Sequence, residues 1–421
     1  MEHKRLLIFS HNCLSKTGSN GRTLANYLRG WPKEKLAQFY MHPEQPDRGM
    51  CENYFCLPDT VILRSILKRR PAKAVECQGA DKPSAEKKIK VSRKKNSAVF
   101  LVRDMAWKSP FWDHSQLDKW VAAFAPECIL VQAGDAGFLF RMALRYAKRY
   151  KIPIIVYNTE GYYFKKVSYL PETGLTRLFY PLVVRRFRKD YDRLVRASSA
   201  QIYNCQMLRD DYEAVYGPGA QVIMSNSDFT NEPVYPNKKK QMVYAGNLSL
   251  NRHRSLIELA CAVGKADPDL WVDVYGKAPN AEVQQELESC PFIRLHGFIP
   301  YEQLQQILRE SRYLVHVESF DDFYKEDLKY AVSTKIADSL ASGSCLVVYA
   351  PENMAVSQYL ADKNAALLIC QQADLNTAVA AMLEDEARCN AISSAGRKLA
   401  EANHNMEINR EKFQKIVLGE V

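Results

Sequence analysis

One predicted helix begins with residue types that can bind phosphate. Its first residues are Ser333, Thr334 and Lys335, with Asp338 one turn further on and Gly343 after the last turn. Hydroxyl groups and unpaired backbone N–H groups at a helix N-terminus bind anions, and the lysine adds a positive charge. Asp338 shares a helix face with Lys335 and could accept hydrogen bonds from paired ribose hydroxyls. The pattern predicts a nucleoside diphosphate site, and an ordinary helix cap with an ion pair one turn apart is the alternative.

A second helix start carries two arginines. Gly246 and Asn247 are expected where a strand ends, and Arg252 and Arg254 at the beginning of the helix that follows. The positive end of the helix macrodipole repels cations, so two arginines there do not stabilise the helix. They are explained if an anion lies between them, and a solvated surface pair is the alternative.

Near the N-terminus, small residues form a loop between a predicted strand and a predicted helix. Gly18 and Gly21 lie in this loop, but a phosphate-binding P-loop would need a glycine in place of Lys16 and a lysine in place of Arg22. The loop could let a ligand approach the backbone, or it could be a structural turn.

These loops belong to a chain in which short apolar runs alternate with amphipathic stretches, which predicts an α/β fold with parallel sheets. Strands are expected at 5–10, 128–134, 152–158, 198–205, 221–227, 242–247, 270–276, 293–298, 313–319, 345–350 and 365–370. This pattern predicts two Rossmann-like domains that face each other across a cleft. The loops that bind ligands are expected at the carboxyl ends of the strands. The expected organisation is an N-terminal domain at 1–227, a linker at 228–241, a C-terminal domain at 242–400, and a helical segment at 401–421 that packs back on the N-terminal domain.

Charge is unevenly distributed along the 421 residues. Of the net charge of +10, residues 68–95 supply +8, with 11 Lys or Arg against 3 Asp or Glu. Trp107 and Trp112 follow, and this combination favours an anionic membrane surface. The alternative is a solvated basic loop over 68–96 without fixed structure. Nucleic acid is not expected as a partner, because no RNP or helix-turn-helix signature is present.

Several other patterns narrow the class of protein. No apolar run reaches the length of about 18 residues that a membrane span needs. The first residues lack a signal-peptide cleavage site, so a cytoplasmic protein is expected. The 11 cysteines contain no C-x-x-C pair, which indicates reduced thiols and no zinc site.

The second half of the chain resembles a known family. The segments "HVESF", "STKIADSLASGSCLVVYAPENMAVSQYL", "YAGNLSLNRHRSL", "VDVYG" and "LHGFIPYEQLQQIL" resemble group 1, family 4-like glycosyltransferases of the GT-B fold, nearest to bacterial members that build surface polysaccharides. In that family the second domain holds a nucleotide-sugar and the first faces the acceptor. The resemblance implies retention of anomeric configuration without an enzyme nucleophile.

The resemblance also assigns roles to residues. The family has two acids eight residues apart, and the second falls on Asp338, while Tyr330 stands where the first would be, so the first role passes to Glu318. Catalytic roles are thereby expected for Glu318, Lys335 and Arg254. Donor contacts are expected from Gly246, Asn247, Arg252, Ser333, Thr334, Asp338 and Gly276. No metal site or cofactor is expected besides the nucleotide-sugar as co-substrate.

On the acceptor side, polar residues end two strands of the first domain. Asp135 and Glu160 are candidates together with Gly18 and Gly21, and a loop carboxylate without function is the alternative. Tyr162 and Tyr163 follow Glu160 and could stack on a sugar ring. A lone histidine such as His11 is more often structural.

The sequence therefore predicts a glycosyltransferase of the hexosyltransferase type. It would transfer a sugar from a uridine-linked diphosphate donor to a saccharide, lipid-linked, in capsule or lipopolysaccharide synthesis. It would lie in the cytoplasm, at the inner face of the membrane. The alternatives are a nucleotide-sugar epimerase of the same fold, which needs no acceptor, and a non-catalytic saccharide-binding protein.

Overall fold

The computed structural model describes residues 2–15, 19–68, 74–75, 96–108, 114–166, 168 and 174–420. Gly18, Trp112 and most of the basic loop at 68–96 lie outside the described residues. The chain divides into two compact units. Unit 1 comprises Met1–Asn204, Leu208–Val222 and Arg410–Val421, and unit 2 comprises Cys205–Met207 and Ile223–Asn409. Residues 228–241, expected as a linker, group with unit 2.

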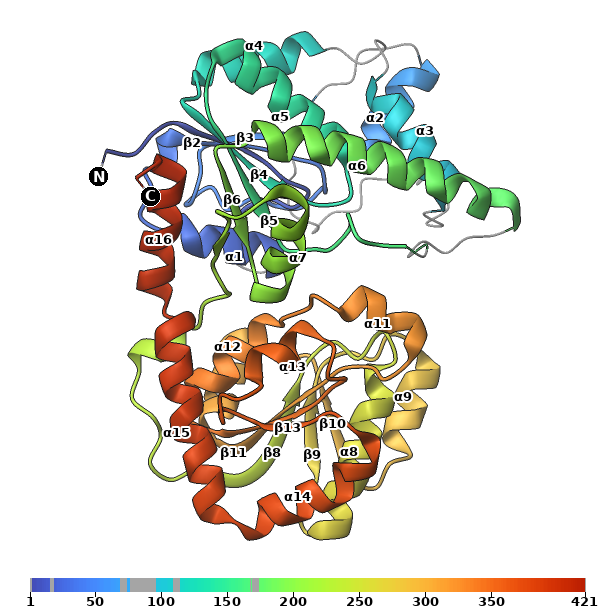
Figure 1. Ribbon diagram of the computed structural model, residues 1–421, viewed down its shortest axis with the longest axis vertical. Helices are drawn as coiled ribbons and strands as arrows, with labels where there is room; N and C mark the ends of the chain where they lie inside the picture. The colour runs from blue at the N-terminus through green and yellow to red at the C-terminus, as the bar shows by residue number, and fades with distance from the viewer. Residues whose placement is uncertain are drawn as a thin grey trace. The chain divides into compact units, whose positions relative to one another are not determined.

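Unit 1 is built on a parallel sheet of seven strands in the order β3-β2-β1-β4-β5-β6-β7 (Figure 1). The strands are β1 (Leu6–Phe9), β2 (Leu36–Tyr40), β3 (Asn53–Cys56), β4 (Cys128–Ala133), β5 (Ile154–Asn158), β6 (Ala200–Tyr203) and β7 (Gln221–Val222). Its main helices are α1 (Ser19–Tyr27), α2 (Asp59–Lys68), α3 (Ser97–Lys108), α4 (His114–Phe124), α5 (Gly137–Tyr150), α6 (Tyr180–Ala197) and α7 (Gln206–Tyr216), with the 3₁₀ helix η2 (Gly174–Phe179) before α6.

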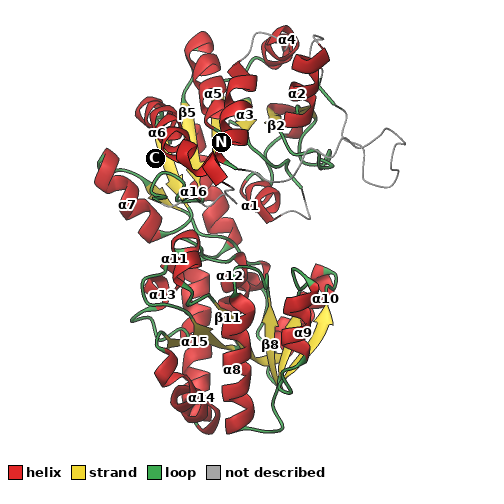
Figure 2. Cartoon of the chain, turned by 90° about the vertical axis from the view of Figure 1, so that its right-hand side faces the viewer, coloured by secondary structure: helices red, strands yellow, loops and turns green. Residues whose placement is uncertain are grey.

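Unit 2 is built on a parallel sheet of six strands in the order β10-β9-β8-β11-β12-β13. The strands are β8 (Lys239–Ala245), β9 (Val272–Tyr275), β10 (Ile293–Gly297), β11 (Ser311–Val317), β12 (Cys345–Tyr349) and β13 (Leu367–Ile369). Its helices are α8 (Arg252–Ala266), α9 (Ala281–Glu288), α10 (Tyr301–Glu310), α11 (Asp322–Leu328), α12 (Thr334–Ala341), α13 (Ala355–Leu360), α14 (Leu375–Glu384) and α15 (Glu386–Asn403), followed by α16 (Met406–Leu418). In each unit the helices surround the strands (Figure 2).

The α/β fold with two parallel sheets, predicted from the sequence, is confirmed. Two strands escaped the sequence analysis, β2 and β3. The β2 run is interrupted by Gln38, which is nevertheless fully buried because its side chain bonds Ser10 Oγ and the backbone of Asn12 and Leu14. A polar residue with all its partners inside the core is invisible to an apolar pattern.

Two aromatic contacts show where α16 and Trp107 pack in unit 1. In α16, Phe413 stacks on Tyr27 with ring centroids 4.9 Å apart, and Gln414 Nε2 donates to the Tyr27 and Arg29 carbonyls at 3.1 Å each. Trp107 stacks on Phe138 at 4.3 Å and is only 4% exposed. The expectation that Trp107 contacts a membrane is wrong, because its side chain belongs to the core of unit 1.

Each sheet reverses its strand order once. The chain leaves β1 toward β2 on one side and later returns to β4 on the other, and β8 stands in the same relation to β9 and β11. In open α/β sheets, the loops at such a switch point diverge and leave a crevice at the carboxyl ends of the strands, where ligands bind. The loops after β8 and β11, and after β1 and β4, are therefore where a site is to be sought. Within the described part of the chain, no helix has the length and apolar composition to cross a bilayer.

Candidate active site

Three neighbouring strands of unit 2 end in glycine, where their backbones lie in close contact. A Cβ on Gly276 would lie 2.3 Å from the Gly246 carbonyl oxygen, and the Gly276 N–H donates to the Gly297 carbonyl at 3.0 Å. Gly297 has φ +71°, in the left-handed region that favours glycine. This edge of the sheet therefore presents peptide groups rather than side chains, which lets a ligand approach the backbone.

The loop from β8 to α8 is held in a strained turn. Asn247 Oδ1 accepts a hydrogen bond from the Ser249 N–H at 2.9 Å, and Leu250 and Asn251 have φ of +60° and +58°. Asn251 Nδ2 donates to Asp321 Oδ2 at 2.9 Å, which ties this loop to the one that follows β11. The switch point of unit 2 is thus bordered by two loops that hold each other.

A second link between the same loops is a buried ion pair. Arg252 Nε donates to Glu318 Oε2 at 2.7 Å and Arg252 Nη2 donates to Glu318 Oε1 at 3.2 Å, the two-point geometry in which arginine binds carboxylates best. Glu318 is 1% exposed, and its Oε1 also lies 3.2 Å from His316 Nε2. Burial alone would raise the pKa of Glu318, but His316 and Arg252 outweigh it and leave the pKa below its usual value. Glu318 is therefore ionised at neutral pH and is the anion that Arg252 contacts.

Arg254, two residues further along α8, differs from Arg252. Its side chain is exposed, and no ion-pair partner for it occurs among the described residues. Because it stands in the first turn of α8, where the helix macrodipole is positive, an external anion would stabilise it. Of the two arginines that sequence analysis singled out, Arg252 pairs with Glu318, whereas Arg254 has no ion-pair partner among the described residues.

The helix start that began the sequence analysis forms as expected. Ser333 is the N-cap of α12, and its Oγ accepts a hydrogen bond from the Lys335 N–H at 3.3 Å. Ser333, Thr334 and Lys335 are half-buried, and Gly343 follows the helix with φ +73°. A capped helix N-terminus with a lysine in its first turn can bind an anion through N–H groups and charge.

Asp338 lies one turn inside α12 and is 2% exposed. Its Oδ1 accepts a hydrogen bond from Ser227 Oγ at 2.8 Å, and its Oδ2 accepts one from Tyr301 OH at 2.9 Å. Asp338 also fixes the segment before β8 and the start of α10 relative to α12.

In unit 1, the switch point joins His11 and Asp135. His11 Nε2 lies 3.1 Å from Asp135 Oδ1, and each side chain is about one-sixth exposed, at 16% and 17%. The His11 ring occupies the space beside Gly134, where a Cβ would come within 2.3 Å of it. His11 was set aside in the sequence analysis, and the one signal that could have found it is its place directly after the first strand.

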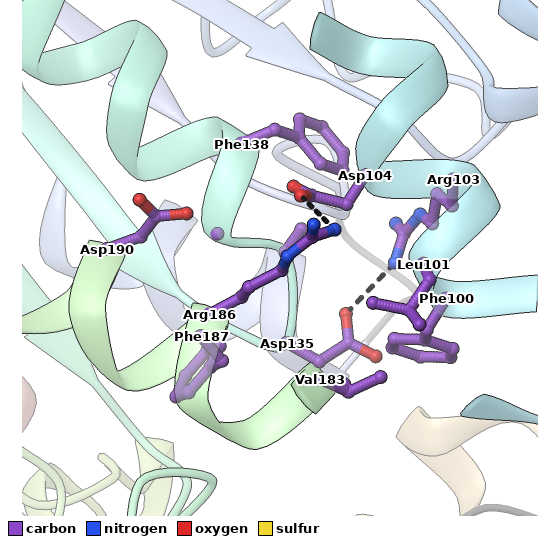
Figure 3. A pocket seen from close by; sticks show the side chains of 12 residues that line it. Phe100, Leu101, Arg103, Asp104, Asp135, Phe138, Val183, Arg186, Phe187 and Asp190 are labelled. Atoms are coloured by element: carbon purple, nitrogen blue, oxygen red, sulfur yellow. Dashed lines mark hydrogen bonds and ion pairs between the residues drawn. The ribbon is translucent and has the colours of Figure 1, made fainter. Parts of the chain in front are cut away.

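Beside Asp135 lies a small pocket of about 40 Å³ (Figure 3). Its polar lining is paired: Arg103 Nη1 lies 3.4 Å from Asp135 Oδ1, and Arg186 Nη1 lies 3.9 Å from Asp104 Oδ2. Asp135 is thus a wall residue of the pocket that contacts both Arg103 and His11.

The remaining candidates of unit 1 lie apart from this pair. Gly21 lies within α1, where a Cβ would come 2.2 Å from the Cys13 carbonyl oxygen, so its role in the structure is close packing of helix against loop. Glu160 is exposed after β5, and its N–H donates to Asn158 Oδ1 at 3.2 Å. Tyr163 lies in a cluster of aromatic rings with Tyr191. Gly18 is outside the described residues.

Comparison with known proteins agrees with this geometry. Residues 252–414 match a family model described as glycosyl transferase-like. The GT-B fold that the resemblance implied is confirmed, and the match over residues 252–414 agrees with the resemblance seen in the sequence. The matched region begins at Arg252 and therefore includes Glu318, Lys335 and Asp338.

Solved structures with the same GT-B fold cover nearly all of the chain. HepE from Anabaena, in complex with UDP and glucose, has a TM-score of 0.62 at 11% identity over 100% of both chains. Sucrose-phosphate synthase from Thermosynechococcus elongatus has a TM-score of 0.61 at 13% identity, covering 99% of this chain and 98% of its own. WaaG, a glycosyltransferase involved in lipopolysaccharide biosynthesis, has a TM-score of 0.57 at 12% identity, covering 98% and 100%. Comparison with curated proteins finds no match.

Proposed function

We propose that this GT-B chain transfers a sugar from a uridine diphosphate-sugar to a saccharide acceptor. The single observation that carries the proposal is the α12 N-terminus, where Ser333, Thr334 and Lys335 gather in the loop region after β11, at the switch point of unit 2. The family match over this region supports transferase chemistry. A neighbour of the same fold is described with UDP-glucose, which supports the donor class.

The proposed chemistry follows from charge. Breaking the bond between sugar and phosphate leaves a diphosphate, and preorganised donors aimed at the developing negative charge lower the barrier. Lys335, Arg254 and the first N–H groups of α12 would supply that stabilisation. Asp338 would accept hydrogen bonds from the ribose hydroxyls. Gly246, Asn247 and Gly276 would let the nucleotide lie against the backbone.

In this proposal Arg252 and Glu318 are positioning residues. Glu318 has both oxygens bonded to Arg252, so it holds the loop that carries Arg254. Retention of anomeric configuration, without an enzyme nucleophile, is proposed because the resemblance to the family implies it. The positive groups replace a divalent cation, so a chelator should leave the rate unchanged.

On the acceptor side, we propose that Asp135 and His11 bind hydroxyl groups of the saccharide. An imidazole and a carboxylate that face one another and remain partly exposed can both exchange their mutual contact for sugar hydroxyls. A lipid-linked acceptor of a surface polysaccharide would fit the WaaG likeness in fold. An epimerase remains the second candidate, and formation of product without any acceptor would identify it.

The test of the donor site is Lys335→Ala, measured by calorimetric titration with UDP and by transfer from a panel of nucleotide-sugars. Removal of one donor to the developing charge should lower kcat by about 100- to 1000-fold and weaken UDP binding. Lys265→Ala, at the far end of α8, is the matched control and should change neither quantity. Unchanged UDP affinity and rate in Lys335→Ala would refute the proposed donor site.

A further inference from the structure

Unit 1 presents a group of large apolar side chains on its surface, away from the switch point. They come from α3, η2 and the start of α6, three elements that pack against one another, and Figure 1 shows α3 alongside the beginning of α6. The group, called here the apolar face, consists of Val99, Val102, Met105, Leu175, Leu178, Phe179 and Leu182. Leu175 is 77% exposed, Leu178 73% and Met105 60%.

The exposed apolar residues of α3 lie on one side of the helix. Val99, Val102 and Met105 recur every three residues and so lie along one side of the helix, while Phe100 and Trp107 on the opposite side are buried. A helix that is apolar on both sides is expected only where both sides are covered. A contiguous exposed patch of this kind marks a surface that another body covers.

Positive charge borders the apolar face. The outer side of α6 carries Arg185, Lys189, Arg193 and Arg196, all exposed and without an ion-pair partner among the described residues. On one flank of α6, a recess of about 590 Å³ is lined by Lys165, Lys166, Arg185, Arg188 and Lys189, with Asp192 as its one carboxylate. Asp192 accepts a hydrogen bond from Tyr216 OH at 2.6 Å. Apolar side chains and uncompensated cations therefore meet along one helix.

We propose that this surface docks the protein on an anionic lipid bilayer. Protruding apolar side chains enter the boundary between headgroups and acyl chains, and arginine and lysine bind the lipid phosphates, the combination that holds proteins at membrane surfaces. Charge complementarity favours a bilayer over another protein chain, because the cations are spread along α6 and lie beside the apolar side chains. This inference concerns unit 1 alone and is independent of the donor chemistry.

It also differs from the attachment expected from the sequence. Trp107 is buried beneath the apolar face and not part of it, and the contact is made instead by residues of α3, η2 and α6 that the sequence analysis did not single out. The local signal was the stretch from Gly174 to Leu182, in which four large apolar residues surround Arg177 at the beginning of a basic helix.

The experiment is co-sedimentation of the full chain with two kinds of vesicle, phosphatidylcholine alone and phosphatidylcholine mixed with phosphatidylglycerol. Binding is expected only to the mixed vesicles, and it should be lost at about 1 M salt, where the Debye length is about 3 Å. Each cation near an anionic surface strengthens binding by about fivefold, so Arg185→Ala with Lys189→Ala should weaken it by about 25-fold.

A second double variant tests the apolar part. Leu175→Asp with Leu178→Asp should abolish binding, whereas Phe298→Asp, an 85% exposed apolar residue of unit 2, should leave it unchanged. Circular dichroism and the thermal midpoint verify that each variant is folded. Equal binding to both kinds of vesicle, no binding to either, or unchanged binding of folded Leu175/Leu178 variants would overturn the proposal. Self-association in sedimentation that these same variants abolish would assign the surface to a second copy of the chain instead.

Discussion

In each sheet, one pair of side chains joins the two loops at the switch point, and the two pairs differ in burial. At the switch point of unit 2, Arg252 and Glu318 join two loops through two hydrogen bonds, and Glu318 is 1% exposed. At the switch point of unit 1, His11 and Asp135 join the corresponding loops through one contact, with side chains 16% and 17% exposed. Both oxygens of Glu318 accept hydrogen bonds from Arg252, so the buried pair holds the two loops together, whereas the partly exposed pair can exchange partners. We therefore expect the buried pair to stabilise the loops and the partly exposed pair to contact a ligand.

The buried pair should be the most sensitive point of this comparison. Glu318→Gln leaves the Arg252 guanidinium largely buried opposite a neutral amide, and breaking such a pair costs about 3 kcal/mol. We expect that loss in the free energy of unfolding, measured by urea denaturation with hydrogen exchange of β11 and β12 amides. Asp322→Asn, which removes an exposed carboxylate from a pair with Lys325, should have no measurable effect. A Glu318→Gln protein as stable as the parent would show that the pair does not hold the loops.

A buried histidine should separate the two units in their response to acid. His404 in unit 2 has a pKa lowered to about 4, because burial disfavours its charged form more than the contact with the Ser225 carbonyl favours it. The unfolded chain takes up the proton near pH 6.5, so stability is full above that pH and falls as the pH drops toward 4. At pH 5 the loss is about 2 kcal/mol.

Hydrogen exchange of the β12 amides between pH 7 and pH 5 measures this loss. His404→Asn should lower stability at pH 7, because the contact with Tyr359 is changed, yet flatten the dependence on pH. A pH slope unaltered in His404→Asn would assign the acid sensitivity to other groups.

Substitutions in the partly exposed pair of His11 and Asp135 should affect function more than stability. Asp135→Asn removes charge from a site that keeps its shape, and one hydrogen bond contributes about 1 kcal/mol to stability. If the pair binds acceptor hydroxyls, KM for the acceptor rises while donor hydrolysis and UDP affinity stay as in the parent. A change in UDP affinity would contradict the assignment of acceptor binding to the switch point of unit 1 and donor binding to that of unit 2. Asp118→Asn, a carboxylate that bonds Arg145 elsewhere in unit 1, is the control.

The sequence predicted those features whose causes are local. Ser333 caps α12 and Gly343 follows its end with positive φ, both as residue preferences indicate. The pairing of Arg252 with Glu318 was not foreseen, because the two residues are 66 positions apart and only the order of strands brings them together. The contact of His11 with Asp135 was not foreseen for the same reason, since the two residues follow different strands. Features set by residues within one helical turn can be predicted from the sequence. Contacts across a switch point can be predicted only once the order of the strands is known.

The glycines at the ends of β8, β9 and β10 limit which residues these strand ends can carry. A methyl group on Gly276 would collide with the Gly246 carbonyl oxygen, and one on Gly246 would collide with the Tyr244 ring. A library randomised over these strand ends would therefore return glycine at both positions, whatever sugar the selection demanded. Altered donor preference would have to arise at other positions of the site.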